Sequence, residues 1–303
     1  MLTLFSTPKP FRGHSGIIQR NALQSWKRLH PDVEVILFGD EEGAAEVCAE
    51  LGLRHEPRVE RSPGGPKYLS YLFQRAQEIA RHDFLCYSNC DIVLMSDFGK
   101  AFQAAAAWRR QFLMVGQRWD AEVTQSLEFD RADWEEQLRR VALSRGAQQY
   151  IDMIDYFVFH KGLYRDMPPL VVGRIYWDHW LIWKARSSKL PVVDCSSAVV
   201  AVHQSHDYGY HPGGRQGTFR DEEAMRNYKL AGNGEHLRTI EDATHKVTPS
   251  GRVRRTPWRR QLAGPKRFLW KIFVQKTFPL RKRLGIRREK LQKIFHRDSE
   301  SRA

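Results

Sequence analysis

Short apolar runs alternate with amphipathic stretches over the first third of the chain. The runs are nearly continuous in apolar residues, which is typical of strands buried on both faces. They lie at Leu2–Phe5, Val33–Phe38 and Phe84–Tyr87. In the stretches between them apolar residues recur at helical spacing, around Ile18–Leu29, Ala44–Leu51 and Leu69–Ile79. Strands joined by helical crossovers predict a parallel sheet that helices cover on both faces.

The pattern continues less regularly through the rest of the chain. Residues 100–150 are predicted to form charged helices around a strand at Phe112–Val115. Further strands are predicted at Tyr156–Phe159, Pro191–Val193 and Ala198–Val202. The predicted fold class is therefore α/β, with a mostly parallel central sheet flanked by helices.

Composition changes near residue 245, where Lys and Arg become frequent. The chain of 303 residues has a net charge of +14. Residues 251–303 hold 18 Lys/Arg and three acids, which leaves 31 basic and 32 acidic residues before them. The sequence therefore predicts a nearly neutral domain over residues 1–245 and a basic, helical, amphipathic tail over residues 246–303.

The tail has the composition of a segment that binds a surface. Its apolar stretch Phe268–Val274 is flanked by Lys and Arg and is far shorter than the about 20 residues that cross a bilayer. Such a segment suits the interface of an anionic membrane. Nucleic-acid binding is the weaker hypothesis, because the domain itself has no basic excess. The same composition also allows a disordered tail or a tail docked onto its own domain.

Two further features concern the compartment. The N-terminal segment Met1–Ser6 has neither the basic region nor the long apolar run of a signal peptide. The four cysteines form no CxxC pair and no disulfide-scaffold spacing, which favours reduced thiols. We expect a cytoplasmic protein that is peripheral on the cytoplasmic face of the membrane.

Candidate chemistry gathers where the predicted strands end. The carboxyl ends of parallel strands meet at one edge of a sheet and bind ligands there. The loops Ser6–Phe11, Gly39–Asp40 and Ser88–Asp91 should therefore lie together. Asn89 and Asp91 are two apart, and their oxygens are hard ligands suited to Mg²⁺ or Mn²⁺. A plainer hypothesis is that both residues only terminate a strand.

The segment Phe84–Leu94 resembles the DxD-type segment of GT-A glycosyltransferases, with Asn89 in place of the first acid. Asp155–Tyr164 resembles the strand and turn that precede the acceptor loop in that family. At Val172–Leu181 the family-2-like members have an E-D-x-x-L pattern, and here Trp177 and Asp178 stand at its two acidic positions. The similarity extends over roughly residues 1–230, and its motifs occur in the family's order.

The resemblance implies a GT-A fold and transfer of a sugar from a nucleotide-diphosphate sugar, with Mn²⁺ or Mg²⁺ as cofactor. It also implies a metal ligand in the histidine that ends Ala198–His203. The predicted metal ligands are Asp91, His203 and His206. A zinc site is the rival hypothesis for the histidines, but no cysteine or HExxH context supports it. A hydrogen-bonded loop is the plainer one.

An inverting glycosyl transfer needs a carboxylate that deprotonates the acceptor hydroxyl. We expect Asp178 in that role, with Asp155 as the second choice; Asp178 also suits a helix N-cap. The residues expected to bind the nucleotide-sugar are Thr7, Lys9, Arg12, Asp40, Lys67, Asn89, Gln117 and Arg118, with Asp120 beside the last two. Of these, Lys67 is expected to reach a phosphate from the flexible loop Ser62–Tyr68.

The acceptor implied is a glycan or a lipid-linked molecule, as in the synthesis of cell-surface polysaccharide. Two other functions remain open at this point. A sugar-nucleotide nucleotidyltransferase would need a Gly-rich basic loop after the first strand, and Pro8–Phe11 is a poor version of it. A non-catalytic carbohydrate- or membrane-binding protein is the third hypothesis.

Overall fold

A computed structural model describes residues 1–206 and 213–256 of the chain. Met1–Thr256 forms one compact unit. Most of the predicted basic tail, residues 257–303, lies outside the described residues. None of the helices that are described is both long and apolar enough to cross a membrane.

The unit is built on a nine-stranded sheet in the order β13-β12-β10-β6-β9-β4-β1-β2-β3. All neighbours pair in parallel except β9, which is antiparallel to both β4 and β6, and β13, which is antiparallel to β12. The strands are β1 (Leu2–Ser6), β2 (Glu34–Phe38), β3 (Arg54–Glu56), β4 (Phe84–Ser88), β6 (Leu113–Val115), β9 (Tyr156–His160), β10 (Val192–Asp194), β12 (His245–Val247) and β13 (Val253–Arg255).

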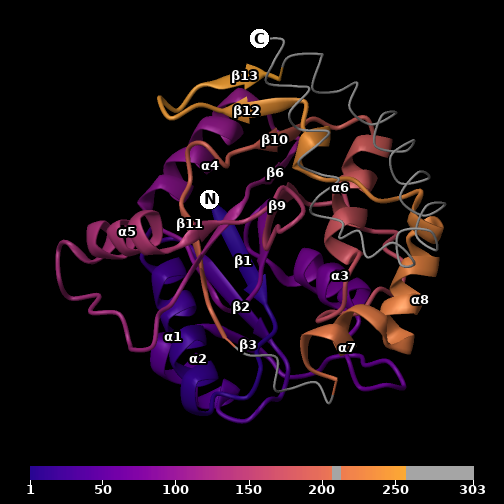
Figure 1. The fold of residues 1–303 in the computed structure, drawn as a ribbon, viewed down its shortest axis with the longest axis horizontal. Coiled ribbons are helices and arrows are strands. Elements are labelled where there is room, and N and C mark those ends of the chain that lie inside the picture. The colour runs from indigo at the N-terminus through magenta and orange to yellow at the C-terminus, as the bar shows by residue number, and fades with distance from the viewer. Residues whose placement is uncertain (207–212, 257–303) are drawn as a thin grey trace, which may run out of the picture. The chain divides into compact units, whose positions relative to one another are not determined.

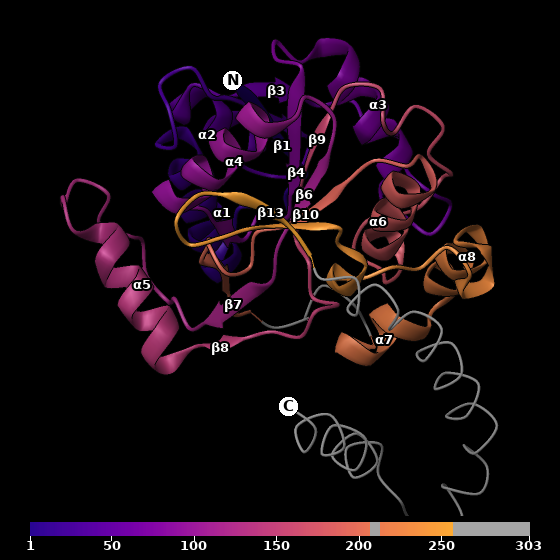
Figure 2. The same ribbon diagram turned by 90° about the horizontal axis from the view of Figure 1, so that it is seen from above.

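Helices cover both faces of this sheet (Figures 1 and 2). One face carries α1 (Gly13–Lys27), α2 (Ala44–Leu51) and α4 (Ser96–Trp108), and the other carries α3 (Leu69–Ile79) and α6 (Trp177–Ser187). Because side chains alternate along a strand, β1 and β4 supply both cores. Leu4 and Cys86 pack toward the first group of helices, whereas Phe5 and Tyr87 pack toward the second.

A second, four-stranded sheet lies beside the first, in the order β5-β11-β7-β8. Its strands are β5 (Ile92–Val93), β11 (Ala201–Gln204), β7 (Arg118–Ala121) and β8 (Ala147–Gln148), and α5 (Trp134–Arg145) connects β7 to β8. Val93, Ala121 and Val202 form a small apolar core with Leu138 of α5. The sheet joins the segment after β4 to the late strand β11, which are far apart in sequence.

The chain then forms α7 (Gly214–Arg220), α8 (Glu222–Leu230) and two short 3-10 helices (Gly232–Gly234 and Ile240–Asp242) before β12. The predicted domain boundary at residue 245 falls at the start of β12. Because β12 pairs with β10, and β13 with β12, the folded unit extends to Thr256. Residues 246–256 of the predicted tail thus belong to the sheet.

The predicted fold class is confirmed: the central sheet is mostly parallel and is flanked by helices. The predicted strands at residues 2–5, 33–38, 84–87, 112–115, 156–159 and 191–193 correspond to β1, β2, β4, β6, β9 and β10. The strand predicted at Ala198–Val202 is shifted, since β11 covers Ala201–Gln204. The reversed direction of β9 was not predicted.

Candidate functional site

The site lies where the parallel strands β1, β2 and β4 end, because their shared direction brings their carboxyl ends to one edge. The antiparallel strand β9 contributes its beginning to the same edge. Ser88 pairs with Tyr156, and the backbone N–H of Asn89 donates to the carbonyl of Asp155 at 2.9 Å. The reversal of β9 therefore places Asp155 beside Asn89.

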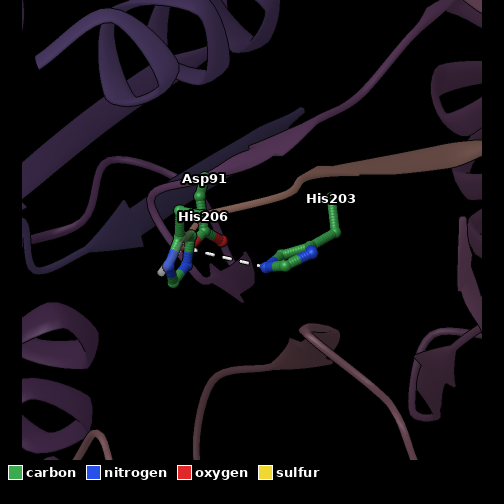
Figure 3. Close-up of side chains that lie close together, drawn as sticks. All are labelled: Asp91, His203 and His206. Atoms are coloured by element: carbon green, nitrogen blue, oxygen red, sulfur yellow. Dashed lines mark hydrogen bonds and ion pairs between the residues drawn. The ribbon is translucent and has the colours of Figure 1, made fainter. Parts of the chain in front are cut away.

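A carboxylate and two imidazoles meet at this edge. The possible ligand atoms of Asp91, His203 and His206 all lie within 4.8 Å of one another. His206 Nε2 is 3.0 Å from Asp91 Oδ2, and His203 Nε2 is 4.0 Å from the same oxygen. Figure 3 shows the imidazole of His203 extending toward the Asp91 carboxylate and the ring of His206.

Strand pairing explains why these residues meet. Asp91 directly precedes β5, and β5 pairs with β11 so that Ile92 lies opposite His203. The buried side chain of Gln204 strengthens this pairing, because its amide donates to the carbonyl of Asp91 at 3.1 Å. The second sheet thus holds His203 beside Asp91, although the two residues are far apart in sequence.

The cluster has the properties of a cation site. The Asp91 side chain is only 14% exposed, and its Oδ1 atom is buried without a hydrogen-bond partner within residues 1–206 and 213–256. Burial raises the pKa of Asp91, but the hydrogen bond with His206 and the charge of His203 outweigh burial and hold this pKa below its usual range. An ionised carboxylate with an unused buried oxygen, next to two imidazoles, fits a divalent cation such as Mn²⁺.

Asp120 supports the cluster from the neighbouring strand. In the parallel pairing of β7 with β11, Asp120 lies opposite His203, and Asp120 Oδ1 is 3.0 Å from His203 Nδ1. A carboxylate on Nδ1 leaves Nε2 facing Asp91, which is the arrangement that orients a metal-binding histidine.

Arg118 links this support to Asp155. Its Nε atom is 2.8 Å from Asp120 Oδ1, and its Nη1 atom donates to Asp155 Oδ2 at 2.6 Å. Burial opposes the charge of Arg118, yet the carboxylates of Asp155 and Asp120 raise its pKa above the ordinary value. Arg118 is thus a permanent cation between two acids and is largely buried.

Asn89 faces Asp155. Its amide nitrogen donates to Asp155 Oδ1 at 2.5 Å, and its amide oxygen accepts from the Tyr87 hydroxyl at 3.3 Å. Both ends of the Asn89 amide are therefore engaged outside the Asp91 cluster. Both Asp155 oxygens are engaged as well, one by Asn89 and the other by Arg118.

Asp178 stands in the first turn of α6 and has a different environment. Its Oδ1 atom is buried without a hydrogen-bond partner in the described part of the chain, and His179 Nε2 lies 3.8 Å from Oδ2. Burial raises the pKa of Asp178, and the negative charge of Asp155 adds to the effect although His179 opposes it. The helix begins at Tyr176 as N-cap rather than at Asp178, and Tyr176 has a φ of 85°, which is strained for a non-glycine residue.

Lys67 is buried rather than free on a loop. Its Nζ atom donates to Thr7 Oγ1 at 2.6 Å and to the carbonyl of Pro8 at 3.2 Å, and it forms an ion pair with Glu41. Burial lowers the pKa of Lys67, although Glu41 opposes this effect. Thr7 Oγ1 in turn donates to the carbonyl of Phe38 at 2.8 Å. Lys67 therefore connects the loops that follow β1 and β2.

The remaining predicted residues are placed as follows. Lys9 Nζ is 3.3 Å from His206 Nε2, so Lys9 joins the Asp91 cluster. Arg12 forms an ion pair with Glu42 at the surface, and its side chain is 73% exposed. Asp40 is also exposed and accepts from Arg61 at 3.0 Å. Gln117 donates to the carbonyl of Gln149 at 2.6 Å.

Sequence reasoning overlooked the role of Glu41. This acid follows Asp40 in a turn, and nothing in the local pattern pairs it with Lys67. From the sequence, Asp120 was expected among the residues that contact the sugar donor or the acceptor molecule, whereas in the structure its carboxylate contacts His203 Nδ1. Its position two residues after Arg118, on the same face of a strand, was the available signal.

Comparison with known proteins gives the following findings. No protein-family model matches the chain, and no curated protein sequence matches it. Among solved structures, glucosyl-3-phosphoglycerate synthase from Mycobacterium tuberculosis in complex with Mn²⁺, UDP and glucosyl-3-phosphoglycerate is similar, with a TM-score of 0.46 and 10% identity over 77% of this chain and 80% of that one.

A second similar structure is S. aureus TarS 1–349 in complex with UDP-GlcNAc, with a TM-score of 0.45 and 13% identity over 68% of this chain and 59% of that one. Another complex of the mycobacterial synthase, with Mg²⁺ and UDP, has a TM-score of 0.42 and 12% identity over 68% of this chain and 72% of that one. All three TM-scores are below 0.5.

Proposed function

We propose that this protein is a GT-A-type glycosyltransferase that moves a sugar from a nucleotide-diphosphate sugar to an acceptor hydroxyl. The observation that supports the proposal is the cluster of Asp91, His203 and His206 at the carboxyl edge of a mostly parallel sheet. This edge is where α/β sheets bind nucleotides. The same cluster separates the proposal from a non-catalytic binding protein, which has no need of a buried unpartnered carboxylate oxygen.

Asp91, His203 and His206 would hold Mn²⁺ or Mg²⁺. When bound, the ion supplies charge neutralisation for the diphosphate leaving group. Asp120 holds the Nδ1 side of His203, so that Nε2 points toward Asp91 without a rearrangement. Lys9, which lies beside His206, brings a further positive charge to the same place.

Asp178 would be the general base. A base needs an oxygen that no other donor occupies and a pKa close to the working pH. Asp178 has an unpartnered Oδ1 atom and a pKa that burial raises. Asp155 suits the role less well, because Asn89 and Arg118 occupy both of its oxygens. We therefore assign proton abstraction to Asp178 and positioning of Asn89 and Arg118 to Asp155.

The donor would lie along the strand-end loops. Thr7 and Lys67 shape the loop after β1, and the predicted contacts at Asp40 and Arg12 lie on the exposed side of the same region. Arg118 borders the cluster from β7 through Asp120, and Gln117 directly precedes that strand. We propose a glycan or lipid-linked acceptor and attachment to the cytoplasmic face of the membrane through the basic tail, which has 15 Lys/Arg over residues 257–303.

A thermal-shift screen tests the proposal. Sugars linked to UDP, GDP, ADP and CDP are added with and without Mn²⁺ to the wild-type chain, to Asp91→Ala and to Asp83→Ala. Asp83 is an exposed acid just before β4, at the opposite edge of the sheet, and serves as the matched control. We expect one nucleotide class to raise the melting temperature only with Mn²⁺, in the wild type and Asp83→Ala but not in Asp91→Ala.

A wild-type chain that shows no metal-dependent response to any nucleotide-sugar would count against the proposal. An Asp91→Ala variant that responds like the wild type would count against the assigned cluster. Turnover then distinguishes sugar transfer from nucleotidyl transfer, because the first releases a nucleoside diphosphate whereas the second releases pyrophosphate.

A further inference from the structure

The hairpin of β12 and β13 is a basic edge of the large sheet, remote from the site. Among residues 1–206 and 213–256, β13 is the last strand of the sheet, and its register places His245 opposite Arg255 and Lys246 opposite Arg254. Both cross-strand pairs therefore join basic residues. Lys246 and Arg254 carry like charges, and like charges directly opposite each other destabilise a hairpin, so this pair is unfavourable for the folded chain alone.

Two helix ends add to this charge. Arg109 follows α4 directly, and Arg186 lies in the last turn of α6. Arg255 lies opposite His245, and Arg109 follows Trp108, whose ring packs against His245. Burial, together with the positive charges of Arg255, Arg109 and Arg186, lowers the pKa of His245. Within the described residues none of these arginines, nor Arg254, forms an ion pair with an acid.

An exposed tryptophan lies among these basic groups. The ring of Trp108 is 4.5 Å from the ring of His245, and Trp108 remains 37% exposed. Tryptophan is enriched at the interface between membrane and water, where its ring lies at the level of the lipid headgroups. We call this surface the basic rim; it consists of Trp108, Arg109, Arg186, His245, Lys246, Arg254 and Arg255.

We propose that the basic rim binds the anionic headgroups of a phospholipid bilayer. Anionic phosphates offset the like charges of Lys246 and Arg254, and Trp108 provides the aromatic group suited to headgroup depth. The chain also leaves the sheet here: β13 ends at Arg255, and the basic residues 257–303 follow. A contact at the rim would thus hold the folded unit on the same surface that the tail is proposed to bind.

The rim is separate from the nucleotide-sugar site. Three strands, β10, β6 and β9, lie between β12 and β4, the strand that leads to Asp91. At about 4.8 Å per strand, β12 lies roughly 19 Å from β4. The inference therefore does not rest on the proposed enzymatic function, and either can fail without the other.

Co-sedimentation of the full chain with vesicles tests the proposal. One set of vesicles is phosphatidylcholine alone, and the other contains equal parts of phosphatidylcholine and phosphatidylglycerol. The rim variant combines Arg186→Gln, Arg254→Gln and Arg255→Gln. The control combines Arg58→Gln, Arg145→Gln and Arg165→Gln, which remove the same charge from exposed positions on other segments.

We expect the wild type to bind the anionic vesicles and not the neutral ones. Each arginine near an anionic surface strengthens partitioning about fivefold, so the rim variant should bind about a hundredfold more weakly than the control. Its melting temperature should not fall, because Arg254→Gln removes a like charge that faces Lys246. A melting temperature equal to that of the control shows that the variant is folded.

Equal binding of the rim variant and the control to the anionic vesicles would overturn the proposal, since the tail alone would then explain membrane binding. Wild-type binding to neutral vesicles of the same strength would overturn it as well. If the rim variant instead keeps its vesicle affinity and loses affinity for a short single-stranded RNA, the rim is a nucleic-acid surface and the proposal fails.

Discussion

Replacing Asn89 with aspartate tests whether this side chain faces the metal site around Asp91 or the carboxylate of Asp155. In sequence, Asn89→Asp restores the DxD pattern and would be expected to add a ligand to the metal site. In the structure, the Asn89 amide donates to Asp155 Oδ1 at 2.5 Å. An aspartate there would place its carboxylate against that of the buried Asp155. Arg118 would be the cation in contact with this pair.

The cost has two parts. The hydrogen bond to a charged group is lost, which removes about 1.5–3 kcal/mol. Two ionised carboxylates about 4 Å apart repel each other by about 4 kcal/mol at an effective dielectric constant of about 20. The two carboxyl groups limit this repulsion by sharing one proton, and the charge of Arg118 offsets part of the remaining repulsion. We expect the free energy of unfolding to fall by about 4 kcal/mol at pH 7.

The sign of the pH dependence follows from the shared proton. One carboxyl of the pair has a folded-state pKa above its unfolded value, so its stabilising contribution is complete at low pH and is lost as the pH rises through that folded-state pKa. Denaturation curves from pH 4 to pH 7 should therefore show the variant approaching the wild type at pH 4. Asn89→Ala is the control, because it removes the same hydrogen bond without adding a charge and should lack this added pH dependence.

Titration with Mn²⁺, followed by electron paramagnetic resonance, completes the experiment. Because both ends of the Asn89 amide face away from the Asp91 cluster, Asn89→Asp should not tighten Mn²⁺ binding. The reasoning is refuted if the variant binds Mn²⁺ more tightly and is as stable as the wild type at pH 7. In that case residue 89 would face the metal and Asp155 would not be its partner.

Three further variants examine other parts of the site. Asp120→Asn should weaken Mn²⁺ binding about 10- to 100-fold, because it alters the group that orients His203; unchanged affinity by calorimetry would contradict this role. Asp178→Asn should abolish transfer. It should also raise the free energy of unfolding at pH 7, since a buried carboxyl with a raised pKa costs stability above that pKa. In the wild type the transfer rate should fall as the pH drops through the same pKa. Lys67→Met should cost about 1.5–3 kcal/mol in urea denaturation, because it removes the buried cation from Glu41 and leaves Arg61 as the partner of that acid. Lys67→Met with Glu41→Gln should recover part of this loss.

The elements that were easiest to predict are those whose burial is uniform. β1, β2 and β4 are covered by helices on both faces, so their sequences are nearly continuous apolar runs. Helix α3 was predicted with its observed bounds, Leu69–Ile79, because its apolar residues face a single core. In such elements local pattern and tertiary burial agree.

The direction of β9 could not be predicted, since an apolar run has the same pattern whichever way the strand lies. The hairpin β12–β13 was missed for a different reason. Its strands His245–Val247 and Val253–Arg255 are short and mostly basic, so they resemble the start of a tail. Pairing with β10 makes them strands, and this pairing depends on tertiary structure.

At the site, sequence reasoning identified strand ends rather than contacts. It grouped Asp91 with His203 and His206, which the structure brings together, although metal binding there remains a prediction. It expected Lys67 to reach a phosphate, whereas the structure buries it against Glu41. Such pairings depend on how separate loops approach one another, and no local spacing encodes that distance.

The arginines of β13 also bear on whether the sheet edges of two copies can pair. A strand at the edge of a sheet exposes unpaired backbone groups that a second copy of the same strand can bind, and such pairing leads to aggregation. β13 is three residues long and carries Arg254 and Arg255, and its counterpart at the other edge, β3, is equally short. Two copies of β13 brought side by side would place arginine against arginine. The same charges that suit an anionic surface therefore also oppose edge-to-edge association.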